Sequence, residues 1–174
     1  LSDEERQTPH MTLDWNMPDR LIVSGSHQAG EKLRLYWDFE RTFFDTFKRT
    51  DLRMDGYPTV RIDRNFKDAN RYALGSEYSP NETLTLQFGV SFAESPVDDE
   101  DRMPDIPVDE ITKIMTGAIY QRTKNFHLHG YAAVEFFGDN KIEQLASIHG
   151  EKIGDSVKLE SDATFFVLGV SFGY

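Results

Sequence analysis

The sequence has 174 residues, of which 39% are hydrophobic and 28% charged, and its 19 basic and 30 acidic residues give a formal net charge of −11. Such an acidic chain has little with which to neutralise phosphates, so no nucleic-acid partner is expected. The absence of cysteine excludes disulfides and thiolate metal sites, and no segment approaches the roughly 20 apolar residues of a spanning helix. A β-strand crosses a membrane with about 9–11 residues and one apolar face, so a transmembrane β-barrel is compatible with this composition.

Eight segments alternate apolar and polar residues, the period that predicts β-strands rather than helices. In chain order they lie at about 11–15, 20–27, 32–40, 70–78, 84–93, 111–121, 126–136 and 161–174. The most regular is 84–93, where five apolar residues, among them Phe88, alternate with small or polar ones such as Gln87. Each segment therefore has one apolar face.

The connections between these segments alternate in length. Tight turns are predicted at 28–31, 79–82 and 123–125, and long polar links at about 49–67, 94–110 and 139–160. Short turns on one side and long loops on the other are typical of outer-membrane barrels. We therefore predict an all-β fold, an antiparallel transmembrane β-barrel region over residues 1–174 without a separate soluble domain. A soluble β-sandwich binding module is the alternative, although nothing in a sandwich imposes this alternation.

The last segment alternates aromatic or aliphatic residues with small ones and ends on the aromatic pair Phe172 and Tyr174. It resembles the closing strand of a bacterial outer-membrane barrel. The resemblance implies a place in the bacterial outer membrane, among its lipids and lipopolysaccharide, and recognition of this strand by the barrel assembly machinery.

Three stretches resemble the FadL family of outer-membrane long-chain fatty acid transporters. They are 65–75 (NFKDANRYALG), 92–97 (FAESPV) with Arg102 and Ile106-Pro107 after it, and 13–18 (LDWNMP) followed by 23–25. The resemblance implies the carboxy-terminal part of a 14-stranded barrel, so we expect the sequence to be part of a longer chain. It also implies passive diffusion of long-chain fatty acids or other hydrophobic molecules through a lumen, without catalysis or a cofactor.

About eight strands are also enough for a small closed barrel whose interior is filled by side chains. A structural or adhesion barrel without transport is therefore an alternative function. An enzyme is not expected, because the sequence has no Gly-x-Ser-x-Gly, His-Glu-x-x-His or phosphate-binding glycine motif.

A fatty acid ligand needs a cation for its carboxylate. Arg61, Arg64, Lys67 and Arg71 cluster at the start of the 70–78 segment and in the link before it, and Arg71 points inward by parity. A charge-assisted hydrogen bond from one of them would hold the head group. The alternative is that they form surface ion pairs with Asp63 and Asp68, which contribute little.

The ligand also needs an apolar lining, and a set of large side chains is inward by the same parity. These candidates are Tyr36, Met115, Ile119, Tyr131 and Phe137. The alternative for them is plain interior packing. Glu94 resembles an acidic position of the family's loop and is a gate candidate. His127 and His129 share a face without an evident third ligand, so we expect a hydrogen-bonded network there rather than a metal site.

Overall fold

The structure is a computed structural model that describes residues 11–14, 17–103, 106, 108–123, 126–148 and 151–173. Within these residues it contains β-strands and one short 3₁₀ turn, η2 (Phe44–Phe47). None of the described helical segments is long and apolar enough to cross a membrane.

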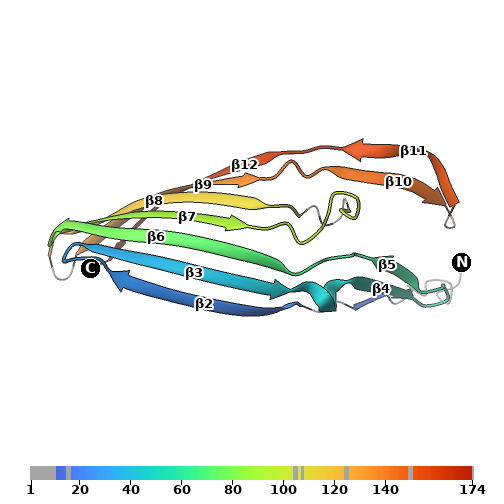
Figure 1. Ribbon diagram of the computed structural model, residues 1–174, viewed down its shortest axis with the longest axis horizontal. Helices are drawn as coiled ribbons and strands as arrows, with labels where there is room; N and C mark the ends of the chain where they lie inside the picture. The colour runs from blue at the N-terminus through green and yellow to red at the C-terminus, as the bar shows by residue number, and fades with distance from the viewer. Residues whose placement is uncertain are drawn as a thin grey trace, which may run out of the picture.

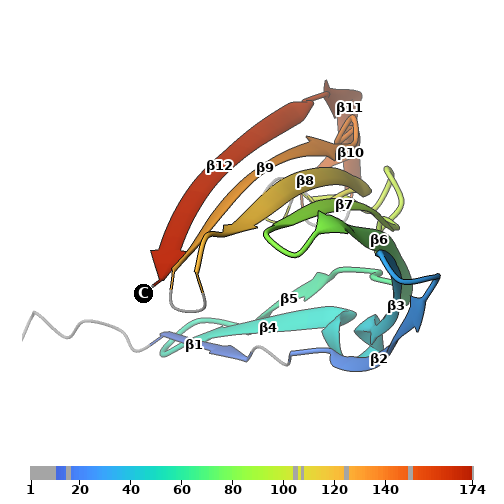
Figure 2. The ribbon, with the colours of Figure 1, turned by 90° about the vertical axis from the view of Figure 1, so that its left-hand side faces the viewer.

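Seven antiparallel strands form the main sheet, in the order β12-β9-β8-β7-β6-β3-β2 (Figure 1). Their bounds are β2 (Asp19–Gln28), β3 (Leu33–Phe43), β6 (Ala69–Asn81), β7 (Leu84–Ala93), β8 (Ile111–Gln121), β9 (His127–Phe137) and β12 (Ala163–Gly173). They coincide with the last seven of the eight predicted segments. The sheet curls into an open arc (Figure 2), and in the described part of the chain β2 and β12 are its two edges.

The remaining strands form two smaller sheets. One has the order β1-β4-β5, with bounds β1 (Met11–Asp14), β4 (Arg49–Met54) and β5 (Val60–Asp63), and the other pairs β10 (Ile142–Ile148) with β11 (Glu151–Leu159). The expectation that the 11–15 segment is a barrel strand is therefore wrong. Its apolar Met11 and Leu13 pair with Met54 and Leu52 of β4, a strand that the sequence reading left inside a loop.

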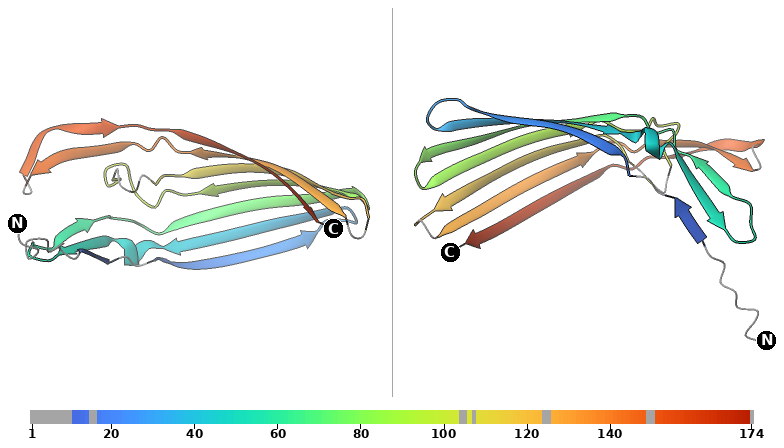
Figure 3. Two further views of the ribbon diagram at one scale, coloured as in Figure 1. Left: turned by 180° about the vertical axis from the view of Figure 1, so that it is seen from behind. Right: turned by 90° about the horizontal axis from the view of Figure 1, so that it is seen from below.

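The two ends of the main sheet differ, as the alternation of link lengths predicts. One end carries the tight turns between β2 and β3, β6 and β7, and β8 and β9 (Figure 1). The β2–β3 turn contains Gly30, whose φ of 91° favours glycine. The other end, called the outer end below, carries the long links, and β4, β5, β10 and β11 extend from it (Figure 3). Two of the predicted loops, 49–67 and 139–160, thus contain hairpins.

The register gives the sheet one apolar face and one mixed face. A row of paired residues on the apolar face reads Gly25, Trp37, Leu74, Val90, Ile114, Val134 and Phe166. The neighbouring row on the opposite face reads Ser26, Tyr36, Gly75, Gly89, Met115, Ala133 and Val167. The apolar face is the more exposed of the two, with Leu74 64% and Leu168 83% exposed, as the outside of a curved sheet requires. An apolar outer face and a more polar inner face are the pattern of a transmembrane barrel.

Among the described residues, the buried hydrophobic side chains lie at the outer end rather than between layers of sheet. Phe47, Phe66 and Val97 are at most 5% exposed and form one cluster. Phe44 packs edge-on against Phe66, with ring centroids 5.6 Å apart. These residues come from the β3–β6 and β7–β8 links, so the two links fold together as a cap on the sheet.

Candidate functional site

The concave face of the main sheet holds a cavity of about 830 Å³. The floor of the cavity is made of four small residues, Ala73, Gly75, Gly89 and Gly117. Because they have short side chains or none, they leave space above the sheet. Larger residues from β3, β8 and β9 surround them: Tyr36, Met115, His129 and Tyr131. Its volume lies in the range of small-molecule sites, which are roughly 300–1,000 Å³.

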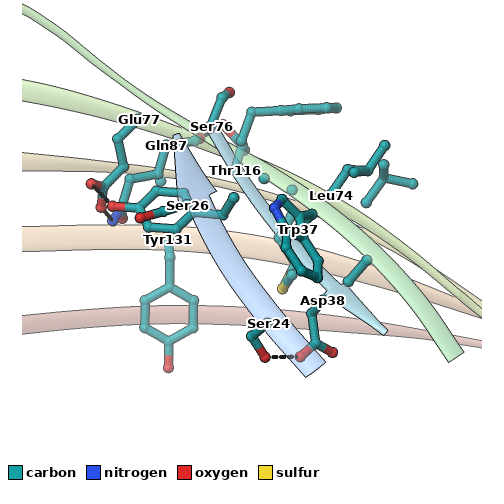
Figure 4. A pocket seen from close by; sticks show the side chains of 18 of the residues that line it. Ser24, Ser26, Trp37, Asp38, Leu74, Ser76, Glu77, Gln87, Thr116 and Tyr131 are labelled. Carbon is teal, nitrogen blue, oxygen red and sulfur yellow. Dashed lines mark hydrogen bonds between the residues drawn. The ribbon is translucent and has the colours of Figure 1, made fainter. Parts of the chain in front are cut away.

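Two carboxylates line this cavity, and both accept hydrogen bonds within it (Figure 4). Glu77 accepts from the Tyr36 hydroxyl at 2.5 Å and from Gln87 Nε2 at 2.8 Å. Asp38 accepts from Ser24 Oγ at 2.6 Å. Among the described residues that line the cavity there is no Lys or Arg.

Tyr131 and His129 form the β9 side of the cavity. The Tyr131 ring lies so close to Gly169 of β12 that a Cβ at this glycine would collide with it. Glycine at 169 therefore lets the ring lie across the neighbouring strand. His129 lies beside Tyr131, with ring centroids 5.5 Å apart and the ring planes tilted by 40°. Its buried Nε2 has no hydrogen-bond partner among the described residues.

The structure separates the predicted apolar lining into two groups. Tyr36, Met115 and Tyr131 line the cavity. Ile119 and Phe137 share its face by register but lie nearer the two ends of the sheet, outside the lining. Phe137 packs at the outer end against Phe165, with centroids 5.2 Å apart. Parity predicts the face that a strand residue occupies, but not its height along the lumen.

None of the four predicted cations is among the residues that line the cavity, although Arg71 bonds to one that is, and each of the four has a partner. Arg71 donates from Nη2 to Asp38 at 2.6 Å and to Glu40 at 2.9 Å. Arg61 pairs with Asp51 at 3.4 Å on the β4–β5 hairpin, and Lys67 pairs with Asp98.

Arg64 is only 4% exposed and donates to Thr50 Oγ1 at 3.3 Å. It is thus a buried residue of the outer-end cap. The expected partner Asp68 is instead held by Arg41 at 3.0 Å.

Glu94 joins the end of β7 to the start of β6. Its carboxylate accepts from the backbone N of Asn70 at 3.0 Å and from Asn70 Nδ2 at 2.9 Å. Its own backbone N donates to Asn70 O at 2.9 Å. Glu94 therefore fixes the point where the 94–110 link leaves the sheet, and its role as a gate stays a prediction.

Sequence reasoning missed the most buried charged residue at the outer end. Arg102 is 1% exposed and donates to Val108 O at 2.9 Å and Lys141 O at 2.6 Å. It also pairs with Asp99 at 2.7 Å and Asp109 at 2.9 Å. These bonds connect the β7–β8 link to the start of the β9–β12 link. The sequence offered no signal for this beyond the presence of Arg102 in a family-like stretch.

The arrangement defines a class of protein, an open part of an antiparallel outer-membrane barrel with a cavity on its inner face. The profile of the family described as "Outer membrane protein transport protein (OMPP1/FadL/TodX)" matches residues 5–174, and the chain belongs to this family. The predicted barrel fold, the family and the bacterial outer membrane as its location are thereby confirmed.

Two curated relatives illustrate the similarity. The chain is 24% identical over 176 residues to the long-chain fatty acid transport protein of Escherichia coli O6:H1, covering 96% of this chain and 36% of that protein. It is 29% identical over 122 residues to outer membrane protein P1 of Haemophilus influenzae (strain Rd), covering 69% and 26%.

Solved structures share the fold. A Pseudomonas aeruginosa FadL homologue matches with a TM-score of 0.78 at 19% identity, covering 94% of this chain and 37% of the other. The Pseudomonas putida toluene transporter TodX matches with a TM-score of 0.62 at 15% identity, covering 94% and 36%. The chain thus spans little more than a third of these proteins.

Proposed function

We propose that this protein forms part of a channel that passes hydrophobic molecules across the bacterial outer membrane by diffusion. The observation that carries the proposal is the 830 Å³ cavity on the inner face of a sheet whose outer face is apolar. Its glycine and alanine floor leaves room for a ligand, whereas a structural or adhesion barrel of this size would fill its interior with side chains. Passage down a gradient requires neither a catalytic residue nor a cofactor.

Long-chain fatty acids and similar hydrophobic molecules are the ligands proposed. Relatives with this fold are named for a long-chain fatty acid and for toluene, so the family's names cover both amphiphilic and purely apolar compounds. In this proposal Tyr36, Met115 and Tyr131 contact the ligand in the cavity, and Ile119 and Phe137 continue the path toward the two ends.

In the same proposal, residues at the outer end capture the ligand and control its access to the cavity. Arg61, Lys67 and Arg71 present positive charge near the folded links, and Arg64 supports them from inside the cap. Glu94 holds the base of the β7–β8 link through Asn70 and so acts as the gate residue.

Two further partners belong to the proposal. Outer-membrane lipids and lipopolysaccharide contact the apolar face. The assembly machinery recognises β12, whose Phe172 is 69% exposed; Tyr174 lies outside the described residues.

Narrowing the cavity floor should block passage. In Gly89→Phe an aromatic ring would occupy the middle of the cavity, where even the added Cβ would lie only 3.2 Å from Met115 Cε. We expect uptake of a hydrophobic fluorescent probe to fall by roughly tenfold in cells that depend on the full-length protein.

Gly130→Phe is the matched control, because Gly130 lies on the apolar face and a Cβ there meets no atom within 4 Å. It should assemble and transport like the parent protein. Equal uptake by the two variants, at equal amounts of folded protein in the membrane, would contradict a channel along the concave face.

A further inference from the structure

The charges around the cavity bear on which hydrophobic molecules it accepts. The described lining contains two carboxylates, Asp38 and Glu77, and no Lys or Arg. Both oxygens of Glu77 already accept hydrogen bonds, from Tyr36 and Gln87, and these two donors are thereby committed. Ser24 likewise donates to Asp38. A ligand carboxylate would therefore meet two like charges and few uncommitted donors.

Cations elsewhere on the concave face offset these charges only in part. Arg71 lies between Asp38 and Glu40 and bonds to both, so its charge is shared between two carboxylates. Lys113 pairs with Glu135 farther along the sheet.

Arg34, near the tight-turn end, donates to Gln28 at 3.0 Å and is not part of the cavity lining, but it also lies near enough to Tyr36 and Glu77 to interact with both. Around the wall that the described residues form, the three carboxylates Asp38, Glu40 and Glu77 outnumber the two cations Arg34 and Arg71, so the balance of charge is negative.

We propose that this cavity accepts uncharged hydrophobic molecules in preference to anionic amphiphiles of the same chain length, with Asp38 and Glu77 as the specificity-determining residues. The inference rests on the proposed function and specifies the substrate class of the same site. An apolar chain needs only the Gly75, Gly89 and Met115 surface, which costs no desolvation of charge. An anion would have to lose water beside like charges, which raises its free energy in the bound state.

The direct test compares two ligands that differ only in the head group. Binding of 1-tetradecanol and of tetradecanoate at pH 8 is measured by displacement of an uncharged fluorescent probe from the full-length protein purified in detergent. We expect the alcohol to bind about tenfold more tightly, a ratio that corresponds to about 1.4 kcal/mol. Equal affinities, or tighter binding of the acid, would overturn the inference while leaving the channel function intact. Displacement by neither ligand would overturn the channel function as well.

Variants assign the effect to the two carboxylates. In Glu77→Gln and Asp38→Asn the shape of each side chain is kept and its charge removed, so the affinity for the acid should rise relative to the affinity for the alcohol. Glu135→Gln is the control, since it removes one negative charge from the same face outside the cavity lining. An unchanged acid-to-alcohol ratio in both cavity variants, or the same change in Glu135→Gln, would show that Asp38 and Glu77 do not set the preference.

Discussion

Replacing Arg102 with Met is expected to release the outer-end links while the seven-stranded sheet stays folded. The guanidinium is 1% exposed and bonds to Asp109, Val108 O and Lys141 O. Its removal leaves the two carbonyls without this donor and the Asp109 carboxylate without its cation, with only the backbone N–H groups of Glu110 and Asn140, among the described residues, still donating to that carboxylate. Breaking a buried ion pair by removing one partner costs about 3–5 kcal/mol. Because these bonds join only the two links, the loss of stability should be confined to those links. Hydrogen exchange of the amides in 94–103 and 138–142 should accelerate strongly, with little change in β6–β9.

Lys67→Met is the matched control for this prediction. Lys67 also joins two links of the outer end, through Asp98, but its side chain is 53% exposed and Asp98 is 68% exposed. Exposed ion pairs contribute roughly 0–1 kcal/mol, so exchange in the same segments should barely change. Equal protection in Arg102→Met and in the parent protein would show that the hydrophobic cluster around Phe47, Phe66 and Val97 holds the cap without the arginine.

The strands of the main sheet were predictable because alternation with period two requires no knowledge of partners. Each of these strands has one face toward lipid and one toward the lumen, so its pattern appears in the sequence itself. The 11–15 segment shows the limit of this reasoning. Its alternation correctly indicates a strand, but only pairing can show that β4 of a different sheet is its neighbour.

The outer-end links were the least predictable part. β4 carries charged residues on one face and Leu52 and Met54 on the other, a pattern that its many charges obscure in the sequence. Likewise the acidic run 98–101 reads as a solvated loop. In the structure, however, Asp98, Asp99 and Asp101 bond to Lys67, Arg102 and Asn65 respectively. Side chains that come together from separate links are tertiary contacts, which local patterns do not encode.

Only part of the candidate site was predicted, again because the sequence does not show which residues lie side by side. Parity placed Tyr36, Met115 and Tyr131 on the inner face, and all three line the cavity. The carboxylates that dominate its charge, Asp38 and Glu77, share that face but were not singled out. Their importance depends on which cations lie beside them: Arg71 bonds to Asp38, but the described lining itself holds no Lys or Arg. Only the register between β3, β6 and β7 reveals this arrangement.

Phe88→Lys is expected to impair folding into a membrane severely, whereas Gln87→Lys, one residue earlier, should not. Phe88 lies near the middle of β7 on the apolar face and is 54% exposed, so in the outer membrane its side chain contacts lipid. A Lys at the bilayer midplane costs about 2–4 kcal/mol. At position 87 the new ammonium would instead lie on the concave face beside the Glu77 carboxylate, which Gln87 already contacts at 2.8 Å.

The measurement is the free energy of unfolding of the full-length protein in lipid vesicles, from urea titrations of the parent protein and of each variant. A decrease in the free energy of unfolding that is confined to Phe88→Lys supports the assignment of the two faces, on which the channel and its cavity both depend. Equal losses at 87 and 88 would mean that both faces of β7 are buried in an apolar environment. The concave face could not then be the wall of a wet lumen, because the Lys at 87 would have no water to reach.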